Sequence, residues 1–499
     1  MTSRRDLIKL GALAAGSASA AALPGDPEEL VDIQHGYSAG SLTENCLARI
    51  ESLNHLSAAI NAVIELNPAA LKTAGELDRE RKAKGPRSPL HGVPVLIKDN
   101  IDVAGPMLTS GGSLALMDAP APRDAPLVAR LRAAGAVILG KTNLSEWANF
   151  RGQHSTSGWS ARGGQTKNPY ALDRNPSGSS SGSAAAVAAA MCPVAIGTET
   201  DGSIVSPSSI CGLVGIKPTV GLVSRTGIIP ISASQDTAGP MARTVRDAVL
   251  LLSAIAEPKT PTDYAQSLDA AGLRGARLGI VRNRFGFQAG VDKLMDEMIA
   301  AMKSHGAEII DPVELPPDAK IAEPEMDVLL FELKAGLNAY FKARGRSETL
   351  ESLIAFNRKN ATRELRYFGQ ELFEQAQKKG PLTDPAYLKA RAECIRLSRT
   401  EGIDAATAKH KLTALVAPTS CLAWLTDYIN GDSASGGCST APAVAGYPHI
   451  TVPAGLVGGL PAGVSFFGPA WSEPALIKVA YAFEQATRAR RKPTYAPSV

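Results

Sequence analysis

The sequence predicts an α/β fold, with one large domain around a mixed, largely parallel sheet that carries helices on both faces. Short apolar runs, typical of buried strands, alternate along the chain with segments of helical periodicity. No low-complexity linker and no internal repeat divides the 499 residues, so we expect one domain despite this length. The strand-like runs lie at residues 93–97, 136–139, 194–196, 277–281, 414–416 and 450–452.

The helical segments are placed by their start signals and their periodicity. Residues 41–44 (Ser-Leu-Thr-Glu) have the spacing of a capping box, and apolar residues recur on one face of the segment that follows. Residues 125–134 and 292–305 are also helix-periodic and separate strand-like runs. From about 320 to 411 the chain is charged and helix-periodic, without a strong strand signal. We expect this region to form a helical cap over one side of a functional site.

The segment from 177 to 203 carries the strongest chemical signal. It reads SGSSSGS, then an alanine-rich run, an apolar strand and GTETDGS. Glycine-rich turns let backbone N–H groups converge on one point, as the oxyanion of an acyl-transfer reaction requires, and the alanine-rich run supplies a helix that anchors the turn. A flexible Gly/Ser linker is the alternative, but linkers rarely run directly into an apolar helix and strand.

Lys98 ends the apolar run 93–97 and is followed by Asp99 and Asn100. For most lysines such a position indicates a side chain that reaches the surface or forms a salt bridge. Beside a hydroxyl-rich glycine loop, a lysine buried by apolar neighbours has another use. Burial lowers the lysine pKa from about 10.4, and the neutral amine that results is a base.

These segments resemble the amidase signature family, whose members use a Ser-cisSer-Lys triad in place of Ser-His-Asp. Carried over position by position, Lys98 in GVPVLIKDN matches the base, Ser179 in SGSSSGS the bridging serine and Ser203 in GTETDGSI the nucleophile. The two serines lie 24 positions apart, the separation that family members show. Further matching segments on both sides extend the resemblance over about residues 38–490.

The resemblance implies an amide hydrolase that needs no metal and no other cofactor. In this mechanism neutral Lys98 accepts a proton from Ser179, which accepts one from Ser203 as its Oγ attacks the carboxamide carbon. Backbone N–H groups of the turn before and at the nucleophile stabilise the oxyanion, each by roughly 3–4 kcal/mol in acyl-transfer enzymes. The residues that supply these groups are Thr200, Asp201, Gly202 and Ser203.

Specificity is where this chain departs from the commonest family pattern. Many members have paired glycines before the nucleophile, where this chain has Asp201-Gly202, and many have arginine at the position of Val205. The segments EWANFRG, SGWSARGGQT and GTETDGSIV are similar to bacterial peptide amidases, which remove the carboxy-terminal amide of peptides. We expect that reaction here, with hydrolysis of other acyl or aryl primary amides as the alternative. The side chains expected to line the substrate site are Trp147, Asn149, Phe150 and Arg151.

Histidine and cysteine chemistry has less support. Of the seven histidines, His91 lies nearest to Lys98 in sequence, but a structural role in a turn is the favoured interpretation. No Gly-x-Ser-x-Gly elbow with a suitable acid and histidine is present. The six cysteines show no spacing typical of zinc, and a disulfide between Cys421 and Cys438 stays open.

The amino terminus is typical of an exported protein. Arg4 and Arg5 precede a stretch rich in Leu, Gly and Ala that ends in Ala-Ser-Ala at 18–20. The pattern predicts a twin-arginine signal over residues 1–20, cleaved on export to the periplasm or beyond, and an amidase signature domain over 21–499. The stretch is too short and too rich in small residues to span a bilayer.

The charge balance excludes several classes of partner. Residues 1–20 hold three basic residues and one acidic residue, so their removal lowers the formal net charge from +4 to +2. A nearly neutral protein has no general attraction for nucleic acid or anionic lipid. We expect a monomer that acts on small peptide or amide substrates, without stable membrane association after signal cleavage. A transamidation subunit that works with tRNA conflicts with the export signal, and a catalytically dead binding protein conflicts with the filled triad.

Overall fold

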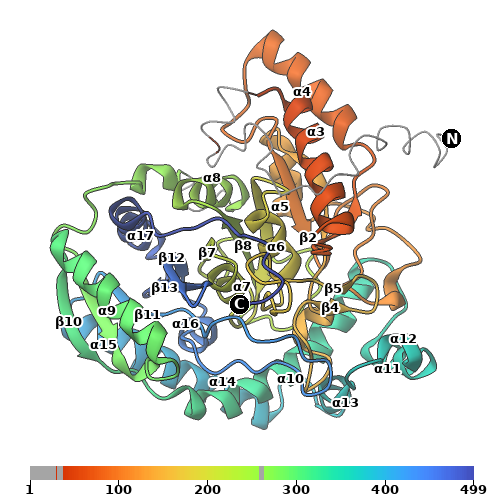
Figure 1. Cartoon of the computed structure of the whole chain (residues 1–499). Coiled ribbons are helices and arrows are strands. Elements are labelled where there is room, and N and C mark those ends of the chain that lie inside the picture. Colours follow the sequence, from red (N-terminus) through yellow and green to blue (C-terminus); the bar gives the residue numbers. More distant parts are fainter. Residues whose placement is uncertain (1–29, 31–36, 258–262) are drawn as a thin grey trace.

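An 11-stranded sheet runs through the molecule (Figure 1). The computed structural model describes residues 30, 37–257 and 263–499, so the predicted signal at 1–20 lies outside the described residues. In spatial order the strands are β1 (Val63–Leu66), β3 (Val137–Thr142), β2 (Pro94–Lys98), β6 (Val194–Glu199), β8 (Thr237–Ala242), β7 (Val214–Lys217), β12 (His449–Val457), β13 (Leu460–Phe467), β11 (Ala414–Pro418), β9 (Arg277–Val281) and β10 (Glu308–Val313).

The directions of these strands confirm a mixed sheet but not a largely parallel one. Only four of the ten neighbouring pairs are parallel. The hairpin β12–β13 shows why the expectation was wrong: Val457 pairs with Leu460, so Gly458 and Gly459 alone reverse the chain, with φ of 58° and 82°. Positive φ at both positions is the turn that joins antiparallel strands most tightly. The Gly-Gly pair between two apolar runs was therefore a hairpin signal.

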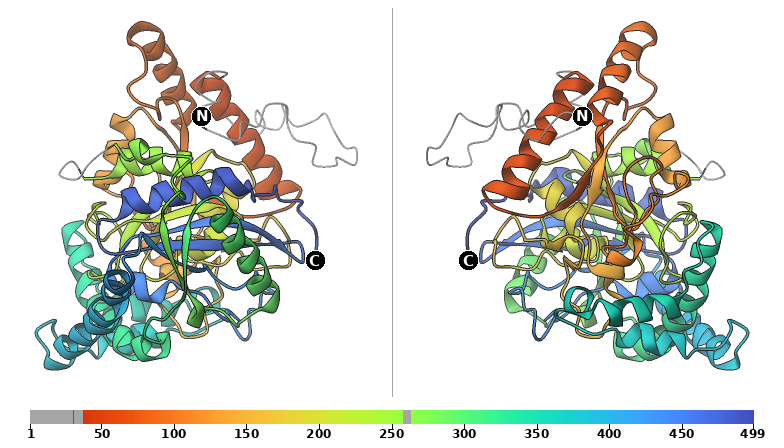
Figure 2. Two further views of the ribbon diagram at one scale, coloured as in Figure 1. Left: turned by 90° about the vertical axis from the view of Figure 1, so that its left-hand side faces the viewer. Right: turned by 90° about the vertical axis from the view of Figure 1, so that its right-hand side faces the viewer.

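Helices cover both faces of the sheet, as predicted. On one face the helices pack against one another as well as on the strands; they are α5 (Pro126–Ala133), α8 (Val245–Ile255), α9 (Ala289–Ser304) and α17 (Glu473–Thr487). The other face carries α6 (Ser181–Ala188) and α7 (Val205–Ile210), which contact each other, with α16 (Thr440–Ala445) nearby. Two further helices, α3 (Ala39–Arg49) and α4 (Ala70–Lys84), pack together and stand out from the body beside β3 (Figure 2).

Between β10 and β11 the described chain forms helices only. They are α10 (Asp318–Ala343), α11 (Leu350–Lys359), α12 (Ala361–Glu364), α13 (Glu371–Gln377), α14 (Pro385–Ile395), the π-helical turns of η6 (Arg396–Ile403) and α15 (Asp404–His410). The long helix α10 contacts α13, α14 and α16 and so joins this region to the body. Its apolar side belongs to a separate hydrophobic cluster that includes Leu333, Phe341 and Phe373.

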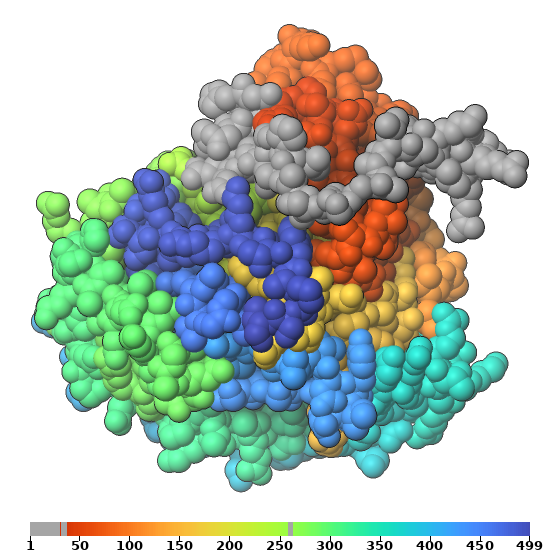
Figure 3. All heavy atoms as spheres, viewed as in Figure 1, coloured from red at the N-terminus to blue at the C-terminus, as the bar shows by residue number. Residues whose placement is uncertain are grey.

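The chain beyond α17 stays attached to the body. Leu172 N–H donates to Ala496 O at 2.8 Å, and Tyr495 N–H donates to Pro169 O at 3.0 Å. Figure 3 shows this last segment, in dark blue, lying across the surface. Among the described helices, none combines the length and the apolar character that a membrane crossing requires.

Candidate active site

Lys98 is the last residue of β2, and its side chain is fully buried. β2 lies between two parallel neighbours and is apolar on both faces, as is typical of a strand covered on both sides. Lys98 Nζ lies 2.8 Å from Ser179 Oγ, 3.0 Å from Ser180 Oγ and 2.9 Å from Thr198 Oγ1. Within the described part of the chain, the side chains that this amine contacts by hydrogen bonds are therefore all hydroxyls.

Burial lowers the pKa of Lys98 to about 7. The cause is that an ammonium loses more hydration energy on transfer into an apolar interior than a neutral amine does. The carboxylates of Glu199 and Asp236 act in the opposite direction but do not cancel this effect. A large fraction of the amine is consequently uncharged at neutral pH and has a lone pair available.

The neighbouring polar groups define where that lone pair points. Ser180 Oγ–H donates to Thr198 O at 3.0 Å, so Ser180 Oγ is an acceptor toward Lys98. Asn100 Nδ2 donates to Thr198 Oγ1 at 2.9 Å and fixes that hydroxyl beside the amine. A neutral amine has two hydrogens and one lone pair. In the neutral form the two hydrogens have acceptors in Ser180 Oγ and in the two oxygens of Thr198, whose carbonyl lies 3.2 Å away, and this leaves the lone pair for the hydroxyl of Ser179.

Ser179 and Ser203 lie on adjoining loops. Ser179 follows a cis peptide bond with Gly178 and precedes α6, and Ser145 N–H donates to its carbonyl at 3.1 Å. Ser203 lies in the turn between β6 and α7, and its carbonyl accepts from Ser180 N–H at 3.2 Å. The structure thus places Lys98 against Ser179 and joins the Ser179–Ser180 segment to the loop of Ser203 by a backbone hydrogen bond. Lys98 contacts Ser179 directly, and Ser203 lies on the loop that Ser180 holds in place.

The predicted oxyanion turn is anchored on both sides. Thr200 Oγ1 donates to Asp236 Oδ1 at 2.7 Å, and Asp201 Oδ2 accepts from Thr440 Oγ1 at 2.9 Å. Gly202 has a φ of 76°, and a Cβ at this position would lie 3.0 Å from Ser439 Oγ, so glycine suits both the backbone and the space. Among the described residues, none accepts a hydrogen bond from the backbone N–H groups of 200–203. These donors are free for a ligand.

Glu199 stabilises the same turn by hydrogen bonds to the residues at its end. Its Oε2 accepts from the N–H groups of Ile204 at 2.7 Å and Val205 at 3.0 Å, the two residues that follow Ser203. The carboxylate therefore joins the start and the end of the turn. The sequence analysis did not predict this role, although Glu199 directly precedes the predicted oxyanion residues.

A cavity of about 390 Å³ opens beside this turn. Of the four side chains predicted to line the substrate site, only Asn149 borders it. Polar residues predominate among the others, many of them from the segment 419–440 that sequence reasoning did not single out. The lining residues that matter below are Asn149, Ser157, Asp201, Asp318, Trp424 and Asp432.

Trp147, Phe150 and Arg151 do not line this cavity, and the expectation for them is corrected. Trp147 and Phe150 belong to the apolar cluster of the helical region, where the Trp147 ring meets Phe373 edge-on at 5.5 Å. The Arg151 guanidinium is fully buried, pairs with Glu146 and lies 4.3 Å from the Phe368 ring centre. Large apolar side chains and a paired arginine reach the core here because burial stabilises them there.

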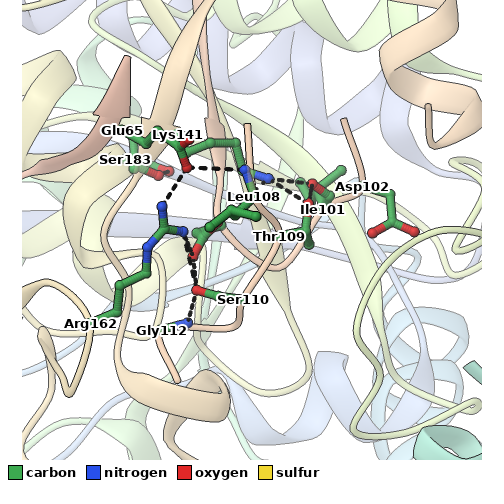
Figure 4. A network of polar contacts seen from close by, with 12 residues as sticks. Glu65, Ile101, Asp102, Leu108, Thr109, Ser110, Gly112, Lys141, Arg162 and Ser183 are labelled. Atoms are coloured by element: carbon green, nitrogen blue, oxygen red, sulfur yellow. Dashed lines mark hydrogen bonds and ion pairs between the residues drawn. The ribbon is translucent and has the colours of Figure 1, made fainter. Parts of the chain in front are cut away.

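A second buried lysine, Lys141 on β3, belongs to an ion-pair network (Figure 4). Its Nζ lies 3.6 Å from Asp99 Oδ1 and donates to Ile101 O at 2.6 Å and Thr109 Oγ1 at 3.0 Å. Arg162 also pairs with Asp99, at 3.0 Å. The network fixes the segment that follows Lys98.

His91 and His449 have structural roles. His91 is buried, and its Nε2 lies 3.0 Å from Leu77 O, as expected for a histidine that stabilises a turn. Burial lowers the pKa of His449 to about 3, so this residue is neutral in the fold. Neither histidine has a hydrogen bond to the serines of the candidate site among the described residues.

The structure also answers the two remaining questions on cysteines and metals for the residues it describes. Cys421 and Cys438 are buried free thiols, not a disulfide. Across residues 30, 37–257 and 263–499, no group of three or more His, Cys, Asp or Glu side chains is arranged to hold a metal ion.

Comparison with known proteins agrees with this geometry. The Amidase family model matches residues 41–477. The X-ray structure of native peptide amidase from Stenotrophomonas maltophilia is 52% identical, with a TM-score of 0.90, over 94% of this chain and 99% of that chain. The crystal structure of an amidase family protein from Bacillus anthracis is 34% identical, with a TM-score of 0.83, over 93% of this chain and 92% of that chain. A probable amidase of Arabidopsis thaliana is 42% identical over 93% of this chain and 91% of the relative.

The fold and these matches define an amide hydrolase. More narrowly, the chain belongs to the amidase signature family, and the family match spans the candidate site from Lys98 to Ser203.

Proposed function

We propose that this amidase removes the carboxy-terminal amide of peptides, giving the free acid and ammonia. Ser203 is the nucleophile, Ser179 the bridging hydroxyl and Lys98 the base. The observation that carries the proposal is the 2.8 Å contact between Lys98 Nζ and Ser179 Oγ at a fully buried lysine whose pKa burial lowers to about 7. The 52% identity to a peptide amidase supports the class of substrate.

The proposed proton path is built on the contact between Lys98 and Ser179. Ser203 Oγ attacks the carboxamide carbon while its proton passes to Ser179, whose own proton passes to the Lys98 lone pair. The oxyanion is held by the N–H groups of the turn 200–203. Collapse of the tetrahedral intermediate breaks the C–N bond, and the proton returns through Ser179 to the departing ammonia. Water then hydrolyses the acyl-enzyme by the same path.

A substrate panel tests this proposal. Ammonia release is measured from dipeptide amides, from simple aliphatic amides and from benzamide-type amides, and mass spectrometry identifies the acid product. We expect the dipeptide amides to have the highest kcat/KM. A higher kcat/KM for aryl or simple acyl amides would show that these amides, and not peptide amides, are the substrate class. A fluorophosphonate probe that labels wild-type protein but not Ser203→Ala distinguishes an active serine enzyme from a catalytically dead binding protein.

Export and solution state complete the proposal. The twin-arginine pattern at 1–20 supports export to the periplasm or beyond, as a monomer without nucleic-acid or stable membrane partners. Fusion of residues 1–40 to a reporter that is active only after export tests the first part. Replacing Arg4 and Arg5 by lysine should abolish export, and unchanged export would rule out the twin-arginine route. Light scattering of the mature protein tests the monomer.

A further inference from the structure

Three residues at the cavity form a chain of hydrogen bonds. Asn149 Nδ2 donates to Ser157 Oγ at 2.6 Å, and Ser157 Oγ–H donates to Asp432 Oδ2 at 2.5 Å. Asp432 also accepts from Ser157 N–H at 2.9 Å and from Trp424 Nε1 at 3.3 Å. Three donors converge on this carboxylate, so Asp432 acts as an acceptor throughout.

This chain fixes which end of the Asn149 amide is free. The single hydrogen of the Ser157 hydroxyl is used by Asp432, so Ser157 Oγ can only accept from Asn149. Asn149 must therefore present Nδ2 to Ser157, and Oδ1 is left over. Asn149 Oδ1 is buried and has no hydrogen-bond partner among the described residues, although Asn149 borders the cavity. A buried acceptor without a partner is costly unless a ligand supplies a donor.

A second acceptor of the same kind belongs to Asp201, which also lines the cavity. Asp201 Oδ1 is buried without a partner among the described residues, whereas its Oδ2 accepts from Thr440. Asp318 and Asp432 also line the cavity, and no lysine or arginine does so among the residues that the structure describes. The lining thus offers two buried acceptors unpartnered among these residues, Asn149 Oδ1 and Asp201 Oδ1, which a ligand with N–H donors satisfies, while the charge of Asp318 is compensated by Arg284 at 2.6 Å.

We propose that Asn149 Oδ1 accepts a hydrogen bond from the carboxamide N–H of the substrate, and that this acceptor-lined cavity separates the amide substrate from the acid product. The inference rests on the proposed function and adds which residue distinguishes the amide substrate from the acid product. Hydrolysis replaces the NH₂ group by an oxygen and leaves a carboxylate. At the position of Asn149 Oδ1 an acceptor then faces an acceptor, so the product binds weakly and leaves.

Binding without turnover tests this most cleanly. In a Ser203→Ala background, calorimetry gives the Kd of a dipeptide amide and of the matched dipeptide acid. We expect the amide to bind at least tenfold more tightly. Asn149→Gly removes the acceptor and suits the backbone, because Asn149 has a φ of 68°. This change should reduce the amide-to-acid ratio about tenfold, the effect of one net hydrogen bond.

Two further variants separate this role from a structural one. Asn61 also has a positive φ, 56°, but does not border the cavity, so Asn61→Gly is the matched control and should leave the ratio unchanged. Ser157→Ala removes the group that orients Asn149 and should reduce the ratio by a smaller factor. An unchanged ratio in Asn149→Gly, or an equal weakening of amide and acid, would overturn the proposal. Wild-type protein that releases no ammonia from any peptide amide would instead contradict the proposed function.

Discussion

Two lysines, Lys98 and Lys141, lie fully buried near the same end of the neighbouring strands β2 and β3, yet their surroundings differ. Lys141 has a carboxylate 3.6 Å away and donates to a backbone carbonyl. Lys98 contacts the hydroxyls of Ser179, Ser180 and Thr198 and the Thr198 carbonyl, and among the described residues no carboxylate pairs with it. Burial lowers both pKa values and carboxylates oppose it in both cases, but only Lys141 has one of these carboxylates, Asp99, in an ion pair.

The difference concerns what a partner can do with a proton. A carboxylate only accepts and is negatively charged, so it stabilises the charged ammonium and keeps the lysine structural. A hydroxyl both donates and accepts, so it tolerates the neutral amine and can pass a proton to it. Burial alone therefore does not make a lysine a base; burial beside hydroxyls and away from a carboxylate partner does.

The largest effect is expected when each of the two lysines is replaced by methionine, because the two replacements should have different consequences. Lys98→Met should lower kcat/KM about a thousandfold or more, because the general base is lost, while the protein still folds. Lys141→Met should lower the free energy of unfolding by about 3 kcal/mol, because Asp99 loses a buried partner, and should keep its activity where it is folded. Steady-state kinetics and urea denaturation measure both. Equal loss of activity in the two variants would remove the distinction.

The pH dependence is the next test. Lys98 must be neutral to act as a base, and its pKa is about 7, so kcat/KM should fall as the pH decreases below 7. One proton is involved, so the fall should be about tenfold per pH unit at the low end. Lys141→Met should retain the same acidic limb. A limb with its midpoint below pH 5 would assign it to a carboxyl group instead.

The smallest expected effect comes from replacing the threonine that contacts each lysine. Thr198 Oγ1 lies 2.9 Å from Lys98 Nζ, and Thr109 Oγ1 accepts from Lys141 Nζ at 3.0 Å. Thr198→Val should lower kcat about tenfold at nearly unchanged KM, because the amine loses a group that orients its lone pair. Thr109→Val should leave kcat unchanged and cost about 1 kcal/mol of stability. If both variants had the same kcat, Thr198 would not orient the base.

The sequence predicted the parts of the site that local patterns determine. Lys98 follows an apolar run, and Ser179 and Ser203 lie in glycine-rich turns flanked by a helix and strands, so strand ends and turns could be located from residue order. The resemblance to a family supplied the roles. The mixed α/β sheet followed from alternating apolar and helix-periodic segments, although the direction of its strands did not.

What the sequence did not predict depends on contacts between distant segments. Asn149 and Asp432 are far apart in sequence and are linked through hydrogen bonds to Ser157. No local sequence pattern indicates these hydrogen bonds. Trp147 and Arg151 had the residue types of a substrate site, but the helical region covers them. A side chain's type indicates what it can contact, and the fold decides whether it reaches ligand or core.

The most direct measurement is the titration of the Lys98 amine itself. NMR spectra of protein with isotope-labelled lysine side chains, compared with those of Lys98→Met, identify the Lys98 signal and follow it with pH. We predict a midpoint near 7, the value to which burial lowers this pKa. A midpoint above 9 would mean that the amine is charged at neutral pH, and the account of Lys98 as the base would be contradicted.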